Sequence, residues 1–166
     1  MRFSYRRSDQ SLERMARLEP NISGVRRQDM NVPGAACPEF DDARLQDRWR
    51  DAHPGKIVPP EIARLKGCRC VIDSRVVGHC IGDSMSGEIT GLSVADAYRR
   101  QGIGRRLLAL VVEALCAAGA SRVWVAAPSD PGLPAYSFYR AAGWAATGEH
   151  TKDGSEILEL HASFRG

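Results

Sequence analysis

The sequence lacks several features that would assign it to particular classes of protein. Its longest apolar run is Leu107–Val112, far short of the roughly 20 residues that span a bilayer. The first ten residues carry positive charge but lead into no apolar stretch, so no signal peptide is expected. The five cysteines form no C-x-x-C pair, which indicates neither a zinc site nor a disulfide framework. We therefore expect a cytoplasmic protein with reduced thiols, no metal and no membrane partner.

The composition is that of an ordinary soluble domain. The chain has 166 residues, of which 43% are hydrophobic and 26% are charged, so it can bury a substantial core. The formal net charge of +3 is too small to indicate nucleic-acid binding. We expect one domain over residues 1–166 and no nucleic-acid partner.

The first third of the chain predicts mostly helix and loop. The expected elements are a strand at Arg2–Arg6, a helix capped by Asp9, a loop over Glu19–Pro38, a helix capped by Asp41 or Asp42 with Leu45, Trp49 and Ala52 on one stripe, and a short helix from Pro59–Pro60 to near Gly67. The acidic residues Glu39, Asp41 and Asp42 are interpreted as a charge cluster at a helix N-terminus, although they could also attract a cationic amine.

The rest of the chain alternates strands and helices. The expected elements are strands at Cys68–Asp73, Val76–Ile81 and Glu88–Val94, a buried helix at Ile103–Ala118, a strand at Arg122–Ala127, a helix at Ala135–Ala142, and strands at Trp144–Gly148 and Glu156–Ser163 around an Asp153-Gly154 turn. A strand, a helix and a strand in succession imply parallel strands joined by a right-handed crossover. Trp124 is interpreted as a core residue of its strand.

Between one expected strand and the buried helix lies a short cationic, glycine-containing segment, Tyr98–Leu108 (YRRQGIGRRLL). A helix start exposes unpaired N–H groups and a partial positive charge. Glycines let the backbone approach a ligand closely, and arginines attract anions. The segment therefore predicts an anion site, most naturally for phosphate, although a tight turn with solvated arginines would also fit the glycines.

The two common nucleotide motifs do not fit this segment. A P-loop needs Gly-Lys-Ser or Gly-Lys-Thr, whereas Gly104 is followed by Arg105 and Arg106. A Rossmann fingerprint needs a small residue where Leu107 stands, and an acidic residue about 20 positions on, which Ser121–Ala127 does not supply.

Residues 99–104 (RRQGIG) and, further along the chain, residues 135–144 (AYSFYRAAGW) form two motifs. In this order they resemble the phosphate loop, Arg/Gln-x-x-Gly-x-Gly/Ala, and the second motif, Ala-x-x-Phe-Tyr-x-x-x-Gly-Phe, of the GNAT family of N-acetyltransferases. The resemblance covers residues 68–166, the expected acetyl-CoA-binding core, and leaves residues 1–67 as a variable acceptor-side region. It implies an α/β fold with a central mixed sheet of about six or seven strands, splayed in the middle and flanked by helices on both faces. Departures are Asp96 where proline is frequent, Ser129-Asp130 where an asparagine is common, and Trp144 for phenylalanine.

The resemblance implies acetyl-CoA as the donor substrate. Its pyrophosphate would lie on the phosphate loop, whose residues here are Arg99, Arg100, Gln101, Gly102, Ile103, Gly104 and Arg105. Its pantetheine arm would pair with the backbone of Leu92, Ser93 and Val94 as an added strand. The acceptor would be an amine of a small molecule or peptide, and the family allows a homodimer.

Acetyl transfer needs a base for the amine and an acid for the leaving thiolate. Glu88 is the candidate base because glutamate bases of the family stand at a similar offset from the phosphate loop; an exposed strand-end carboxylate or a water chain is the alternative. Tyr139 is the candidate acid, because it matches the tyrosine of the second motif, and it also belongs to the coenzyme-binding set. Tyr136 is the second candidate acid, to be considered if Tyr139 does not have this role. A non-catalytic acyl-CoA-binding sensor with the same fold is the alternative function.

Overall fold

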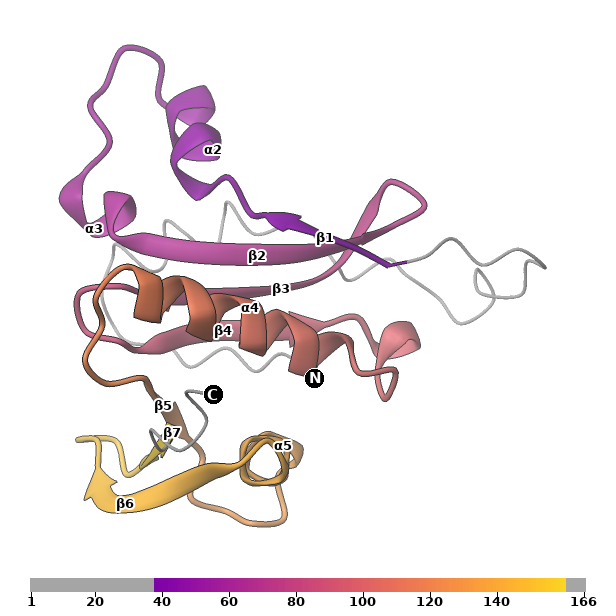
Figure 1. Cartoon of the computed structure of the whole chain (residues 1–166), viewed down its shortest axis with the longest axis vertical. Helices are drawn as coiled ribbons and strands as arrows, with labels where there is room; N and C mark the ends of the chain where they lie inside the picture. The colour runs from indigo at the N-terminus through magenta and orange to yellow at the C-terminus, as the bar shows by residue number, and fades with distance from the viewer. Residues whose placement is uncertain (1–37, 161–166) are drawn as a thin grey trace.

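The computed structural model describes residues 38–160, which form two β-sheets with helices packed on them (Figure 1). The first sheet is antiparallel, in the order β1 (Glu39–Asp42), β2 (Leu65–Ile72), β3 (Arg75–Asp83) and β4 (Ile89–Val94). The second is also antiparallel, in the order β5 (Trp124–Ala127), β7 (Glu156–Leu160) and β6 (Trp144–His150). The helices are α2 (Leu45–Ala52), α3 (Pro60–Ala63), α4 (Ile103–Ala117) and α5 (Pro134–Ala141), with a 3₁₀ turn η2 (Asp96–Tyr98).

The expected opening in the middle of the sheet is confirmed. β4 and β5 meet at a parallel bridge between Glu88 and Trp124, and no further pairing joins them within residues 38–160. Past this bridge the two strands diverge, as Figure 1 shows. Residues 92–94 consequently have a paired neighbour strand, β3, on one side only in the described part of the chain.

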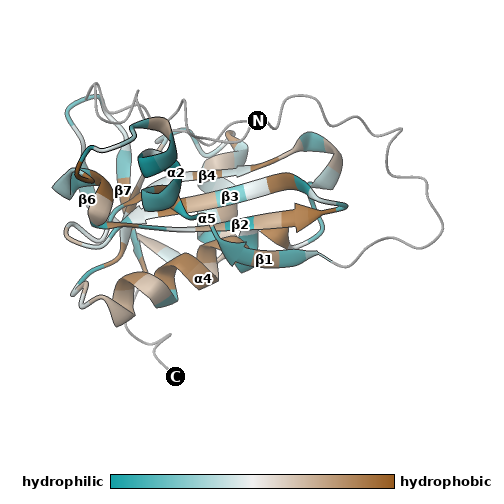
Figure 2. Ribbon diagram, turned by 90° about the horizontal axis from the view of Figure 1, so that it is seen from above, coloured by the Kyte–Doolittle hydropathy of each residue, from teal (hydrophilic) through white to brown (hydrophobic). Residues whose placement is uncertain are grey.

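Helices α2 and α4 lie on opposite sides of the four-stranded sheet (Figure 2). The buried stripe of α4 is Leu107, Val111 and Leu115, at helical spacing. It lies so close to β3 that a Cβ on Gly82 would come within 2.8 Å of Leu115. On the other face Leu45 and Trp49 of α2 and Ile81 of β3 belong to a separate apolar cluster. The two faces therefore have distinct cores.

Most of the elements expected after residue 60 are confirmed, with shifted ends. Gly119 and Gly143 follow α4 and α5 with φ of 92° and 88°, as helix-ending glycines do. The β2–β3 turn is Asp73–Ser74, one residue earlier than expected, because both residues adopt left-handed conformations. The third helix ends at Ala63 rather than near Gly67, because β2 already begins at Leu65.

The interpretation of the acidic cluster as a helix N-terminus is wrong. Residues 39–42 form the edge strand β1, and Asp41 makes a two-pronged ion pair with Arg69 of β2, at 2.6 and 2.8 Å. Helix α2 starts after Arg44, which has no side-chain cap, while the Asp42 carboxylate accepts the Arg44 backbone N–H at 2.6 Å. The expected strand at Arg2–Arg6, the helix at Asp9 and the loop up to residue 37 lie outside the described residues.

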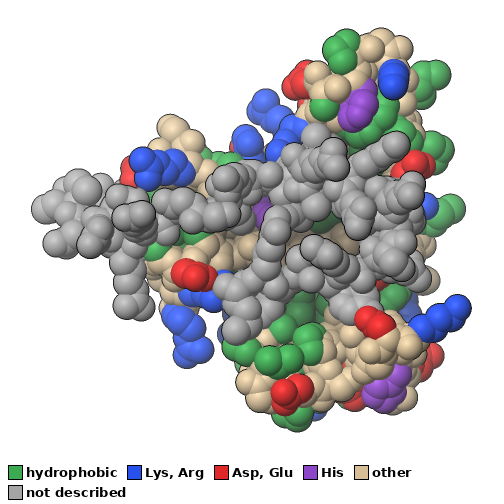
Figure 3. Space-filling view, turned by 180° about the vertical axis from the view of Figure 1, so that it is seen from behind, with side chains coloured by type: hydrophobic (Ala, Val, Ile, Leu, Met, Phe, Trp, Pro, Cys, Tyr) green, Lys and Arg blue, Asp and Glu red, His purple; other side chains and the backbone are tan. Residues whose placement is uncertain are grey.

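The described surface shows no strong separation of charge in the view from behind, where acidic and basic side chains are interspersed (Figure 3). Among residues 38–160 no helix has the length and apolar character that crossing a membrane requires.

Candidate active site

The loop between β4 and α4 presents a helix start that is open to an anion. Arg100 and Gly102 have φ of 64° and 80°, and Gly102 stands at the N-cap without a side-chain hydrogen bond. The first helical bond runs from the Arg106 N–H to the Gly102 carbonyl at 3.0 Å, so the N–H groups before residue 106 precede the helical ladder. The first turn contains no acidic residue. The positive end of α4 is therefore uncompensated within its own first turn.

The four arginines around this loop have different environments. Arg99 donates to the Val94 carbonyl at 3.2 Å and pairs with Asp96 at 2.6 Å, which fastens the loop to the end of β4. Arg105 donates to the Ala141 carbonyl at 3.1 Å and so ties α4 to the end of α5. Arg100 and Arg106 are exposed at the surface. Two of the cations thus also brace the loop, whereas no such backbone contact is found for Arg100 and Arg106 in the described part of the chain.

The two glycines of the loop serve different purposes. Gly102 has open space around its Cα and needs its left-handed conformation. At Gly104 a Cβ would lie 3.4 Å from the Phe138 ring and 3.6 Å from Val94, which is ordinary van der Waals contact. A methyl group therefore fits at Gly104, whereas a larger side chain would meet α5, and this closeness to α5 is not apparent from the loop motif.

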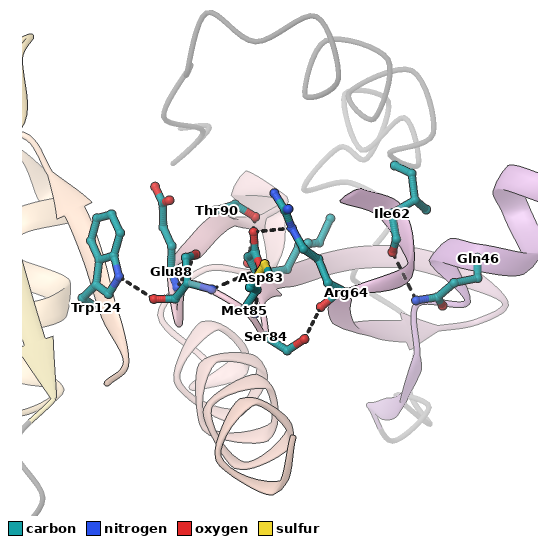
Figure 4. Close-up of polar contacts among 11 residues, drawn as sticks. Gln46, Ile62, Arg64, Asp83, Ser84, Met85, Glu88, Thr90 and Trp124 are labelled. Carbon is teal, nitrogen blue, oxygen red and sulfur yellow. Dashed lines mark hydrogen bonds and ion pairs between the residues drawn. The ribbon is translucent and has the colours of Figure 1, made fainter. Parts of the chain in front are cut away.

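Glu88 lies at the point where the two sheets meet. It is 7% exposed, its backbone bridges to Trp124, and its N–H donates to the Ser86 hydroxyl at 3.3 Å. The backbone N–H of Asp83 donates to the Glu88 carbonyl at 2.8 Å, which places Glu88 opposite Asp83 in the neighbouring strand. Figure 4 shows the Glu88 carboxylate on the side of the strands away from α4.

Tyr139 approaches β4 from the opposite face. It is 4% exposed and lies in the core on the α4 side, with its ring 5.5 Å from that of Trp144. Burial, and then the neighbouring Cys80 thiol, raise the pKa of Tyr139 well above its ordinary value. Cys80 is the cross-strand partner of Leu92, so Tyr139 is near the middle of β4.

The hydroxyl of Tyr136, the second candidate acid, is engaged by another side chain. The Tyr136 hydroxyl hydrogen-bonds to the Glu156 carboxylate, which raises the pKa of Tyr136. The structure therefore brings Tyr139 and Glu88 to β4 from opposite faces and engages Tyr136 elsewhere.

Sequence reasoning missed the role of Trp124 at this site. Its indole N–H donates to the Ser86 carbonyl at 2.9 Å, two residues before Glu88 (Figure 4). A tryptophan on an apolar strand is ordinarily interpreted as a core residue. The hydrogen-bond partner of its indole depends on how the two sheets meet, so the sequence does not predict this bond. Within residues 38–160 no group of three His, Cys, Asp or Glu side chains is arranged to hold a metal ion.

Several solved structures share this fold at low sequence identity. A GNAT family acetyltransferase from Elizabethkingia anophelis with acetyl-CoA bound has a TM-score of 0.53 and 11% identity, covering 75% of this chain and 97% of that one. The ribosomal-protein-S18-alanine N-acetyltransferase from Escherichia coli has a TM-score of 0.50 and 18% identity, covering 74% of this chain and 90% of that one. An aminoglycoside 6'-N-acetyltransferase complexed with coenzyme A has a TM-score of 0.51 and 15% identity, covering 73% of this chain and 94% of that one.

No curated protein sequence matches the chain. The sequence model of the "Acetyltransferase (GNAT) family" matches residues 28–144, which include the β4–α4 loop and the whole of α5. The chain therefore belongs to the GNAT acetyltransferase family and is an acyltransferase.

Proposed function

We propose that this chain transfers the acetyl group of acetyl-CoA directly to a primary amine of a small molecule or a peptide. The observation that carries the proposal is the sequence of features along one strand: β4 diverges from β5 and leads into an α4 start with no acid in its first turn. An extended arm can pair with a strand edge, and an anion can bind at a helix N-terminus. Both features suit the pantetheine and pyrophosphate of the same donor.

The phosphate-binding residues of the proposal are those of the β4–α4 loop. The N–H groups at the start of α4 would receive the pyrophosphate, and Arg100, exposed beside them, would add charge attraction. The side chains of Arg99 and Arg105 stabilise the loop, because they donate to the Val94 and Ala141 carbonyls. The loop residues assigned to this role are Arg99, Arg100, Gln101, Gly102, Ile103, Gly104 and Arg105.

The strand residues Leu92, Ser93 and Val94 are assigned to the pantetheine arm. Their backbone pairs with β3 on one side, and in the described part of the chain no strand pairs with it on the other. Backbone N–H groups on that open side can donate to the arm and to the carbonyl oxygen as it gains negative charge.

Glu88 and Tyr139 are assigned to the two proton transfers. A primary amine has a pKa of about 10 and is protonated near neutral pH, so it must lose a proton before it can attack. In the proposed reaction Glu88 accepts that proton, the amine nitrogen bonds to the acetyl carbon, and the carbon–sulfur bond breaks. Tyr139 then donates its hydroxyl proton to the departing thiolate, and the second proton, which the nitrogen loses as the amide forms, returns through water to the Tyr139 phenolate. Burial keeps the phenol protonated beforehand, and the same apolar surroundings raise the proton affinity of the thiolate.

The acceptor is proposed only as an amine. Two of the solved structures that share this fold are named for their acceptors, a ribosomal-protein alanine and an aminoglycoside. Both are amine acceptors, one a protein and one a small molecule, so the likeness in fold does not choose between them.

The donor is tested by calorimetric titration of the purified protein with acetyl-CoA, with ATP and NAD as controls. Selective micromolar binding of acetyl-CoA supports the proposal, and equal or no binding contradicts it. Free thiol release with a panel of amines then tests the chemistry. Binding without thiol release from any amine would favour an acyl-CoA-binding sensor over an enzyme.

A further inference from the structure

Trp124 joins the two sheets at one point through two hydrogen bonds. Its backbone N–H donates to the Gly87 carbonyl at 3.0 Å, and its indole N–H donates to the Ser86 carbonyl at 2.9 Å (Figure 4). The backbone bond fixes the chains side by side. The indole bond, formed away from the backbone, resists rotation of one sheet against the other about that bond.

The contact at this joint is between backbones and leaves no room for a side chain. Gly87 has φ of +73°, and a Cβ there would lie 1.7 Å from the Arg122 carbonyl oxygen. The β3–β4 turn therefore rests directly on the start of the second sheet.

Each side of the joint is anchored in its own sheet. On the first, the Asp83 carboxylate accepts the Met85 N–H at 2.9 Å and pairs with Arg64 at 2.8 Å, which fixes the turn. On the second, Arg122 pairs with Glu159 of β7 and Glu149 of β6, both at 2.7 Å. The contact between Ser86–Gly87 and Arg122–Trp124, which we call the joint, thus connects two segments that are each held by ion pairs or hydrogen bonds.

We propose that Trp124 is a positioning residue for acetyl transfer. Through its indole bond to Ser86 it fixes the angle at which β5 leaves β4, and with it the placement of Glu88 relative to a thioester lying beside Leu92. This inference rests on the proposed function, because it assumes that Glu88 acts as the base. Trp124 itself touches neither donor nor acceptor in this scheme.

The test compares two variants that each lose one side-chain hydrogen bond at the same turn. Trp124→Phe keeps an aromatic ring and removes the N–H donor. Ser84→Ala removes the Ser84 hydroxyl, which donates to the Arg64 carbonyl at 2.6 Å away from the joint. We expect Trp124→Phe to lower kcat at least fivefold, with KM for acetyl-CoA changed less than twofold. We expect Ser84→Ala to leave both within twofold of wild type.

A purely structural role would give a different result. If Trp124 only stabilised the fold, kcat would fall equally in both variants, or in proportion to the fall in the unfolding midpoint. Either result overturns the proposal. An unchanged kcat in Trp124→Phe also overturns it. The pH profile of kcat/KM adds a second readout, since a displaced base changes the acidic limb, whereas a loss of folded protein lowers the whole curve.

Hydrogen exchange without coenzyme tests the joint independently of activity. We expect the amide of residue 124 to exchange at least tenfold faster in Trp124→Phe, with the amides between β2 and β3 unchanged. Unchanged exchange at residue 124 would overturn the joint even in an active enzyme. Wild-type protein that releases no thiol with any amine would instead contradict the proposed function, and the exchange result would still decide the joint.

Discussion

At the scale of single residues, the proposed acid and base reach β4 from opposite faces of the sheet. Tyr139 lies on the α4 side beside Cys80, and Glu88 points to the other side. An acyl donor lying between the diverging strands would have its sulfur toward one face and its carbonyl open to attack from the other. The separation of the two residues therefore suits a direct transfer, in which both proton movements occur in one complex.

Replacing Tyr139 by Phe should separate chemistry from binding. The ring packing against Trp144 is kept, so we expect the calorimetric Kd for acetyl-CoA to change less than threefold. Turnover should fall at least tenfold because the thiolate loses its proton donor. Tyr136→Phe is the matched control, since the Tyr136 hydroxyl is engaged by Glu156, and its turnover should stay within twofold. Equal turnover in wild type and Tyr139→Phe would remove Tyr139 from the mechanism.

Replacing Glu88 by Gln should alter the pH dependence of the reaction. The amide keeps the shape of the side chain but cannot accept a proton, so we expect kcat to fall at least tenfold and the acidic limb of the kcat/KM profile to disappear. Steady-state kinetics across about pH 5 to 9 would check this. A fall of less than threefold with the acidic limb intact would mean that water molecules or another group serve as the base.

At the scale of elements, the sequence predicts best where local pattern and tertiary setting agree. Helix α4 has a long apolar stripe and a glycine after its end, so its bounds were predicted to within one residue. Strand β1 could not be predicted, because Glu39, Asp41 and Asp42 have little intrinsic preference for strand. Its formation depends on pairing with β2 and on the ion pair to Arg69, which are contacts between distant parts of the chain.

The Asp41–Arg69 pair should make the edge strand sensitive to acid. The hydrogen bond from Arg69 holds the pKa of Asp41 below its usual value, so the pair stabilises the fold above about pH 4. That contribution is lost as pH falls through the lower folded pKa. Because Asp41 is partly exposed, we expect Asp41→Asn to cost less than about 1 kcal/mol at pH 7, and less as the pH falls through the folded pKa of Asp41. Urea unfolding at pH 7 and in acid measures this, and an equal cost throughout would contradict it.

The two loop glycines should fail in different ways when replaced by Val. Gly102→Val forces a left-handed conformation on a branched residue beside the proposed phosphates, so we expect the Kd for acetyl-CoA to rise at least tenfold. Gly104→Val would also weaken binding, but it meets the Phe138 ring and should lower the unfolding midpoint more. Calorimetry and thermal unfolding of both variants distinguish these effects. Unaltered affinity in both would contradict the assignment of the phosphate loop.

At the scale of the whole molecule, the site depends on how two sheets are held at one end and separated at the other. Through the family resemblance, the sequence predicted a sheet that is splayed in its middle, and the structure places this opening between β4 and β5. It could not predict the joint that sets the opening, because the joint consists of the Ser86 and Gly87 carbonyls, which carry no side-chain signal, and an indole read as core. Such contacts arise only once both sheets are folded.

A single methyl group at Gly87 should therefore disturb the whole molecule. In Gly87→Ala the new Cβ would lie 1.7 Å from the Arg122 carbonyl oxygen at a φ of +73°, so the sheets must part or the turn must refold. We expect a loss of more than about 3 kcal/mol in the free energy of unfolding, or failure to fold. Gly91→Ala, in the neighbouring strand, is the control, since its Cβ would meet no atom within 4 Å. Urea denaturation of the two variants compares them directly. Equal stability would mean that the two sheets are not held against each other at Gly87, because a joint of touching backbones has no room for a methyl group.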